Sequence, residues 1–152
     1  MDEKKRPGGL TALAVINFIF AGLNIMGVIG MIFSMSMMGN MPTDGMSEAQ
    51  KAQIAAFQNI EPSTFAITIG ISAILFILLL LSGTGYLLQK RVLGRIVGNI
   101  YAFWGIISVL ISVLILPGAI GGGFGISAII GLIYPALTLV LLDTVFKNDL
   151  NN

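Results

Sequence analysis

The stretch SGTGYLLQKRVLGRIVG, residues 82–98, joins two long apolar runs through a short basic segment. No charged residue occurs between Glu61 and Lys90 on one side of it, and none occurs between Arg95 and Asp143 on the other. A phosphate-binding glycine loop follows a strand and carries its lysine at a fixed spacing, and this stretch has neither feature. The sequence therefore predicts the turn of a helical hairpin, in which the glycines close an apolar helix.

Charge is scarce along the whole chain of 152 residues. Hydrophobic residues make up 56% and charged residues 10%, against roughly 25% charged in an ordinary soluble domain. A helix crosses a bilayer with about 20 apolar residues, and a segment in lipid must satisfy its backbone hydrogen bonds internally. We therefore expect one all-α membrane domain over residues 1–152, an up-down bundle of four transmembrane helices. The expected helices cover residues 10–36, 62–88, 92–116 and 126–146.

The charge-free stretch 96–142 is long enough for two of these crossings. The sequence PGAIGGGFG at 117–125 supplies the turn between them. Pro135 lies inside the last crossing, where a proline kinks a helix and frees the carbonyl of Gly131.

Basic residues gather on one side of this topology. Only Lys51 falls on the opposite side. The others are Lys4, Lys5, Arg6, Lys90, Arg91, Arg95 and Lys147. Loops rich in lysine and arginine stay in the cytoplasm, which predicts a membrane protein with both termini cytoplasmic. The same basic face is expected to attract anionic lipid head groups.

Residues 39–61 are predicted to form an outer loop between the first two crossings. Within it, Ser47 and Gln50 have the spacing of a capping box, in which each side chain satisfies a backbone N–H at the start of a helix. We expect a short helix over residues 47–60. It would lie on the membrane surface or serve as a docking element for a partner.

Small and amide residues recur on helical faces of two of the predicted crossings. Gly94, Gly98 and Ala102 stand four apart, a spacing that lets helix backbones approach closely within one molecule or between subunits. Asn17 and Asn24 stand seven apart in the first crossing and are expected to point into protein, where each can hydrogen-bond across helices. Structural bonding of this kind is one interpretation of the asparagines, and a polar pathway or an ion-coordinating pair is the other.

One arginine and one aspartate lie near helix ends where the helix dipole disfavours their charge. These are Arg95, at the start of the third predicted crossing, and Asp143, near the end of the fourth. We predict that the two pair between the helices and fix their register, with Lys147 as a competing partner. The chain has no His and no Cys, so a nucleophile–base constellation cannot be assembled from it. We expect no enzyme, no cofactor and no nucleic-acid partner.

Methionines are concentrated near the outer end of the first crossing. Thioether sulfur suits Cu(I), but methionine is also a common flexible filler at interfaces. The sequence therefore leaves a copper site as an alternative to ordinary packing. The candidate ligands are Met35, Met37, Met38, Met41 and Met46.

The layout resembles a broad set of small, uncharacterised bacterial four-helix inner-membrane proteins. The resemblance rests on KKRPGGLTALAVINFIFAG at 4–22 and on SGTGYLLQKRVLGRIVGNIYA at 82–102. It implies an inner-membrane protein and carries over no activity and no site residues. Small multidrug transporters have a similar size, but the membrane-embedded glutamate of their first helix is missing here.

The expected function is that of a non-catalytic structural or accessory subunit, in contact with another membrane protein or with further copies of itself. The first alternative is a small oligomeric channel or transporter that lines a path with polar side chains. The residues available for that path are Asn17, Asn24, Asn99 and Thr138. The second alternative is an outward-facing copper-binding protein.

Overall fold

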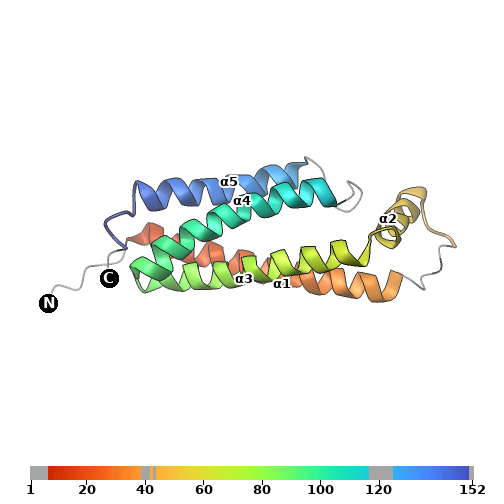
Figure 1. The fold of residues 1–152 in the computed structure, drawn as a ribbon, viewed down its shortest axis with the longest axis horizontal. Helices are drawn as coiled ribbons and strands as arrows, with labels where there is room; N and C mark the ends of the chain where they lie inside the picture. Colours follow the sequence, from red (N-terminus) through yellow and green to blue (C-terminus); the bar gives the residue numbers. More distant parts are fainter. Residues whose placement is uncertain (1–6, 39–41, 43, 117–124, 151–152) are drawn as a thin grey trace.

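The computed structural model of the chain describes residues 7–38, 42, 44–116 and 125–150, and every regular element in these ranges is helical. Four long helices lie roughly along one axis (Figure 1). They are α1 (Gly8–Met38), α3 (Pro62–Leu87), α4 (Val97–Ile115) and α5 (Ile126–Asp143). A short helix, α2 (Glu48–Gln58), lies at one end, and a π-helical segment, η1 (Arg91–Ile96), leads into α4.

Three helical segments are long and apolar enough to cross a membrane. They are Gly8–Met37, Pro62–Leu87 and the combined η1–α4 segment Arg91–Ile115. The fourth, α5, is also apolar but has only 18 residues. The fold is therefore an all-helical bundle compatible with a membrane protein, with three segments that meet the length of a crossing.

The last helix ends earlier than the sequence indicates. α5 stops at Asp143 instead of residue 146, and the chain then continues in turns. The physical reason is burial of two later apolar side chains, Phe146 and Leu150, which fold back into the cluster around Leu10 of α1. A continuing helix would carry these side chains past α1 instead of against it.

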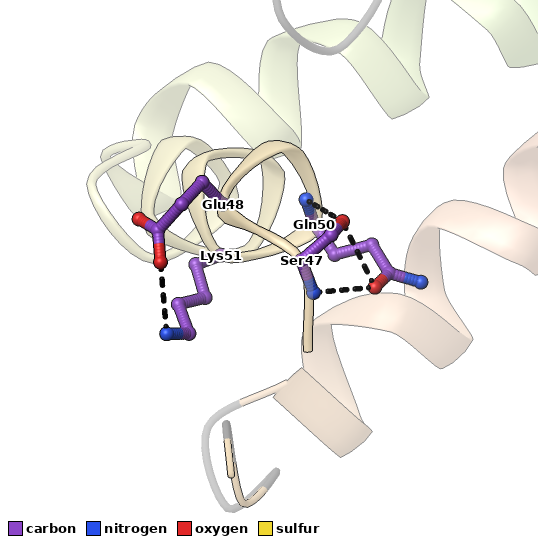
Figure 2. Close-up of polar contacts among 4 residues, drawn as sticks. All are labelled: Ser47, Glu48, Gln50 and Lys51. Carbon is purple, nitrogen blue, oxygen red and sulfur yellow. Dashed lines mark hydrogen bonds and ion pairs between the residues drawn. The ribbon is translucent and has the colours of Figure 1, made fainter. Parts of the chain in front are cut away.

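The short helix α2 begins with the predicted capping box, which is confirmed (Figure 2). The backbone N–H of Gln50 donates to Ser47 Oγ at 3.3 Å, and the backbone N–H of Ser47 donates to Gln50 Oε1 at 2.9 Å. One turn on, Lys51 Nζ lies 3.0 Å from Glu48 Oε1. The ring of Phe57 stacks on that of Phe65 at 6.5 Å between centroids, which joins α2 to α3.

The hairpin between α3 and α4 turns later than the glycines of residues 82–98 suggest. Gly83 and Gly85 lie inside α3, and the chain reverses at Gln89, whose φ of 51° is left-handed. The backbone N–H of Lys90 donates to the carbonyl of Gly85 at 3.0 Å and that of Gln89 to Tyr86 at 3.4 Å. This pattern is a Schellman motif with glutamine in the position that usually holds glycine.

The glycines of this hairpin serve as contact surfaces instead of turn residues. A Cβ atom on Gly85 would collide with the backbone of Leu93 and Gly94, so only glycine allows the end of α3 to touch η1. A Cβ on Gly98 would lie 2.5 Å from the hydroxyl of Tyr86, and one on Gly105 would lie 2.9 Å from Pro135. The small-residue face of η1 and α4, formed by Gly94, Gly98 and Ala102, is thus buried within one molecule.

The four long helices pack unevenly along their length. α1 packs mainly on α3, and α4 packs on α3 and α5. We call the closed end the half of the bundle that holds the start of α1, the end of α3, η1 and the end of α5. The open end is the half toward α2, where the α4–α5 pair diverges from the α1–α3 pair (Figure 1). The closed-end core consists of Leu10, Leu13, Ala14, Tyr86, Leu142, Phe146 and Leu150.

Candidate functional site

A buried group of polar side chains joins three helices just inside the closed end. Asn17 of α1 is fully buried and donates from Nδ2 to Ser82 Oγ of α3 at 2.7 Å. Its Oδ1 accepts a hydrogen bond from the hydroxyl of Tyr134 of α5, which also lies 3.3 Å from the carbonyl of Leu13. The sequence predicts the inward direction of Asn17 but gives no indication of its two partners.

The hydroxyls around this group are bonded along their own helices as well. Ser82 Oγ donates to the carbonyl of Leu78 at 2.7 Å, and Thr138 Oγ1 donates to that of Tyr134 at 2.9 Å. The hydroxyl of Tyr86 is buried without a hydrogen-bond partner in the described part of the chain. The hydrogen-bonded group of Asn17, Ser82 and Tyr134 therefore holds three helices together. Tyr134 also lines the neighbouring cavity.

A cavity of about 580 Å³ lies next to this hydrogen-bonded group, and Tyr134 belongs to both. All four long helices contribute to its lining, which is mostly aliphatic and aromatic. Tyr134 forms one wall, with its ring centroid 4.9 Å from that of Phe20 and 6.2 Å from that of Tyr101. Among the lining residues, polar side chains come from Asn24, Ser108 and the two tyrosines.

A second cavity of about 260 Å³ adjoins the first and shares Asn24, Ser108 and other lining residues with it. Its own lining adds three further hydroxyl side chains, those of Thr68, Ser72 and Ser112. Thr68, Ser108 and Ser112 each donate to a carbonyl of their own helix at 2.8 Å. Their oxygens remain able to accept a hydrogen bond from inside the cavity.

Asn24 differs from Asn17, which lies seven residues before it on the same helix. Its Oδ1 is buried without a hydrogen-bond partner among the described residues, and the side chain lines both cavities. The sequence predicts that both asparagines bond across helices, and the structure shows such a bond for Asn17 alone. The side chain of Asn24 instead lines the two cavities, and its Oδ1 is itself buried.

The predicted ion pair between α5 and the η1–α4 segment is confirmed. Arg95 Nη2 lies 3.2 Å from Asp143 Oδ1, and Asn99 Nδ2 lies 3.4 Å from Asp143 Oδ2. Within the described ranges, Arg95 and not Lys147 is the cation placed on this carboxylate. The Arg95 side chain is 27% exposed and that of Asp143 48%, so the pair lies at the surface of the closed end.

The candidate copper ligands are only partly described. Met35 and Met37 are exposed on the last turns of α1; two residues along a helix is a rotation of about 200°, so they point to different sides. Met46 is partly buried just before α2. Met41 and the side chain of Met38 lie outside the described residues. The predicted turn at 117–124 and the basic residues Lys4 to Arg6 also lie outside them. Among the described residues, no three His, Cys, Asp or Glu side chains gather to hold a metal ion.

No protein-family model matches the chain, and neither a curated protein nor a solved structure matches it. The site must therefore be interpreted from its own chemistry. The residues that sequence reasoning missed are Ser82, Tyr134 and Tyr101. Each is a polar side chain within a long apolar run, which is a signal that could have marked them as inward-facing.

Proposed function

We propose that the protein is a four-crossing integral protein of the bacterial inner membrane and a non-catalytic accessory subunit. Both termini lie in the cytoplasm, and α5 makes the fourth crossing. The partner is another membrane protein or a second copy of the chain. The basic closed end contacts anionic lipid.

The observation that supports a non-catalytic role is how the polar side chains inside the bundle are used. Asn17, Ser82 and Tyr134 bond to one another across three helices. The pair of Arg95 and Asp143 joins two helices at the surface. Side chains used in this way hold helices in register, and they do not form an activated nucleophile with a base beside it.

The orientation is supported by the distribution of charge along the bundle. Lys90, Arg91 and Arg95 lie at the closed end, whereas Asp44, Glu48, Lys51 and Glu61 lie at the end that carries α2. Lysine and arginine near the ends of crossings favour the cytoplasmic side. The closed end is therefore placed in the cytoplasm and α2 outside it.

Because the chain has no cysteine, single cysteines can test this orientation without background. Glu48→Cys and Arg91→Cys, each in otherwise unchanged protein, are treated with a membrane-impermeant maleimide in intact cells with a permeable outer layer. We expect Glu48→Cys to react at once and Arg91→Cys to react only after the inner membrane is opened. The reverse pattern would contradict the orientation.

The subunit role is tested by the mass of the native assembly. The protein is extracted directly into lipid nanodiscs, isolated by a tag, and weighed by native mass spectrometry. We expect a stoichiometric partner or more than one copy of the chain in each particle. A single copy alone, in particles that retain native lipid, would contradict the subunit proposal.

A second candidate function, a small oligomeric channel or transporter, is favoured by one observation. The smaller cavity is lined by Asn24 and by several hydroxyl side chains. Lining of this kind is what a path for a polar solute needs in a membrane. Solute flux into proteoliposomes tests it: Ser72→Leu should reduce any flux, and Ser36→Leu, an exposed serine outside the cavity lining, should leave it unchanged.

A further inference from the structure

We propose that the larger cavity binds a small lipid-soluble alcohol or phenol, a neutral apolar molecule that carries one hydroxyl group. This inference goes beyond the accessory role and does not depend on which partner the protein has. It rests on the size of the cavity, on its lining, and on two polar groups that the protein leaves without partners.

The cavity has the dimensions and lining of a small-molecule site. Its volume of about 580 Å³ lies within the range of roughly 300–1,000 Å³ that is typical of such sites. Its walls are apolar and aromatic, and no charged residue is among them. A charged or strongly polar ligand would lose its hydration there without compensation, so the occupant must be mostly apolar and neutral.

Two polar groups remain free at this cavity in the described part of the chain. Asn24 Oδ1 is buried without a donor, although the same face of α1 two turns earlier carries Asn17 with both ends of its carboxamide bonded. The hydroxyl of Tyr101 likewise makes no hydrogen bond to another described residue, and its ring lines the cavity. Asn17 therefore has hydrogen-bond partners on two other helices, whereas Asn24 Oδ1 at the cavity has none among the described residues.

A hydroxyl group fits these two positions better than the other possible occupants. It both donates and accepts, so it can pair with the Tyr101 hydroxyl and with the Asn24 carboxamide, whose oxygen is buried and must turn toward the cavity for this bond. A lipid acyl chain fills apolar space but offers no donor to a buried oxygen. Water can bond to the few polar groups of the lining, but it leaves the apolar walls, which make up most of this lining, without favourable contacts.

The aromatic walls are held in place independently of any ligand. The Tyr134 hydroxyl is tied to Asn17 and Leu13, so its ring stands fixed between those of Phe20 and Tyr101. A preformed wall of this kind lowers the cost of ordering side chains when a ligand binds. The site therefore suits a compact molecule whose apolar body lies on the rings while its hydroxyl reaches Asn24.

The test uses the full chain in nanodiscs and a photoreactive octanol that carries a diazirine on its alkyl chain. After irradiation, labelled peptides are mapped by mass spectrometry. We expect adducts on cavity-lining residues of α1, α4 and α5, competed by excess 1-octanol and not by n-octane. Asn24→Leu should lower cavity labelling about fivefold, the loss that corresponds to one ordinary hydrogen bond.

Matched variants separate the hydroxyl contact from general damage to the bundle. Tyr101→Phe removes a hydroxyl at the cavity, and Tyr86→Phe removes a buried, unpartnered hydroxyl outside it. The first should lower cavity labelling and the second should not. If Asn24→Leu fails to fold, Tyr101→Phe still tests the hydroxyl contact, and Val109→Phe, which fills the cavity from α4, tests whether labelling depends on the cavity space.

Three results would overturn the proposal. Labelling confined to lipid-facing side chains such as Phe103 would mean that the probe only partitions into the bilayer. Equal competition by n-octane would identify the cavity as space for acyl chains. Unchanged labelling in folded Asn24→Leu and Tyr101→Phe would show that neither polar group recognises a hydroxyl.

Discussion

The closed and open ends of the bundle are built from the same helices, yet they pack in opposite ways. At the closed end, Gly85 meets Gly94 with no room for a side chain, and the helix backbones touch. At the open end, Leu75 and Val109 of the neighbouring helices line cavities instead. In a bilayer, lipid replaces water and gives little drive for helices to associate. The position of small residues therefore decides where this bundle closes.

Polar residues follow the same division. On α1, Asn17 has partners on two other helices, and Asn24 has no partner for its oxygen in the described ranges. The first asparagine stabilises the closed end, while the second leaves an unmet hydrogen bond at the open end. The contrast supports the proposal that the closed end holds the bundle together and that the open end binds a ligand.

The strongest test of this contrast compares two glycines of α3. Gly85→Ala places a methyl group inside the backbone of η1, whereas Gly70→Ala meets nothing within 4 Å. Overpacking of a tight site costs roughly 1–3 kcal/mol or more, and the contact here is with backbone that cannot swing away. We expect Gly85→Ala to abolish the folded closed end or lower its free energy of unfolding by about 3 kcal/mol.

The control substitution should act in the opposite direction. Alanine in place of an unconstrained helical glycine stabilises by about 0.5–1 kcal/mol, so Gly70→Ala should be neutral or slightly stabilising. Reversible unfolding by sodium dodecyl sulfate in mixed micelles measures both. Equal losses at the two positions would mean that the closed end is not specially packed.

A smaller effect is expected from the two asparagines. Asn17→Leu removes hydrogen bonds to Ser82 and Tyr134, and bonds of this kind in membrane proteins contribute about 0.6–2 kcal/mol. Asn24→Leu removes a group without a protein partner for its oxygen and should cost less or stabilise. A double-mutant cycle of Asn17→Leu with Tyr134→Phe should show non-additive losses of unfolding free energy; simple additivity would argue against the bond.

The smallest effects are expected from the ion pairs Glu48–Lys51 and Arg95–Asp143, because all four side chains are at least partly exposed. An exposed pair contributes about 0–1 kcal/mol and weakens with salt. Arg95→Gln and Asp143→Asn should be non-additive in unfolding free energy at low salt, and the coupling should shrink in high salt. Lys51→Gln on α2 should leave the stability of the bundle unchanged, because its partner Glu48 lies on the same short helix.

Much of the fold follows from local features of the sequence. The long uncharged runs identify the four apolar helices, and the spacing of Ser47 and Gln50 identifies the start of α2. The dipole argument identifies the pairing of Arg95 with Asp143 because both charges would otherwise be unfavourably placed. Each of these signals lies within one segment or in one pair of charges, so it can be recognised without three-dimensional information.

The remaining features depend on how helices cross in space. Glycines at 83 and 85 are typical of a turn, but both lie inside α3, where Gly83 faces Phe18 of α1 and Gly85 touches the backbone of η1. α5 ends early because Phe146 finds a place beside Gly9 of α1, which is distant in the sequence. The cavity forms where the α4–α5 pair diverges from the α1–α3 pair. The sequence of any one helix does not show that divergence.

The most direct test of the division into two ends is a pair of distance measurements by pulsed electron paramagnetic resonance in nanodiscs. Each pair of spin labels is attached at exposed sites, one on α1 and one in the α5 region, and the distance between the two labels is measured. The pairs are Thr11 with Val145 at the closed end and Ile29 with Ile126 at the open end. We expect a short, narrow distance distribution for the first pair and a longer one for the second. Similar distances for both pairs would mean that the helices run parallel along their whole length, and would contradict the division into two ends.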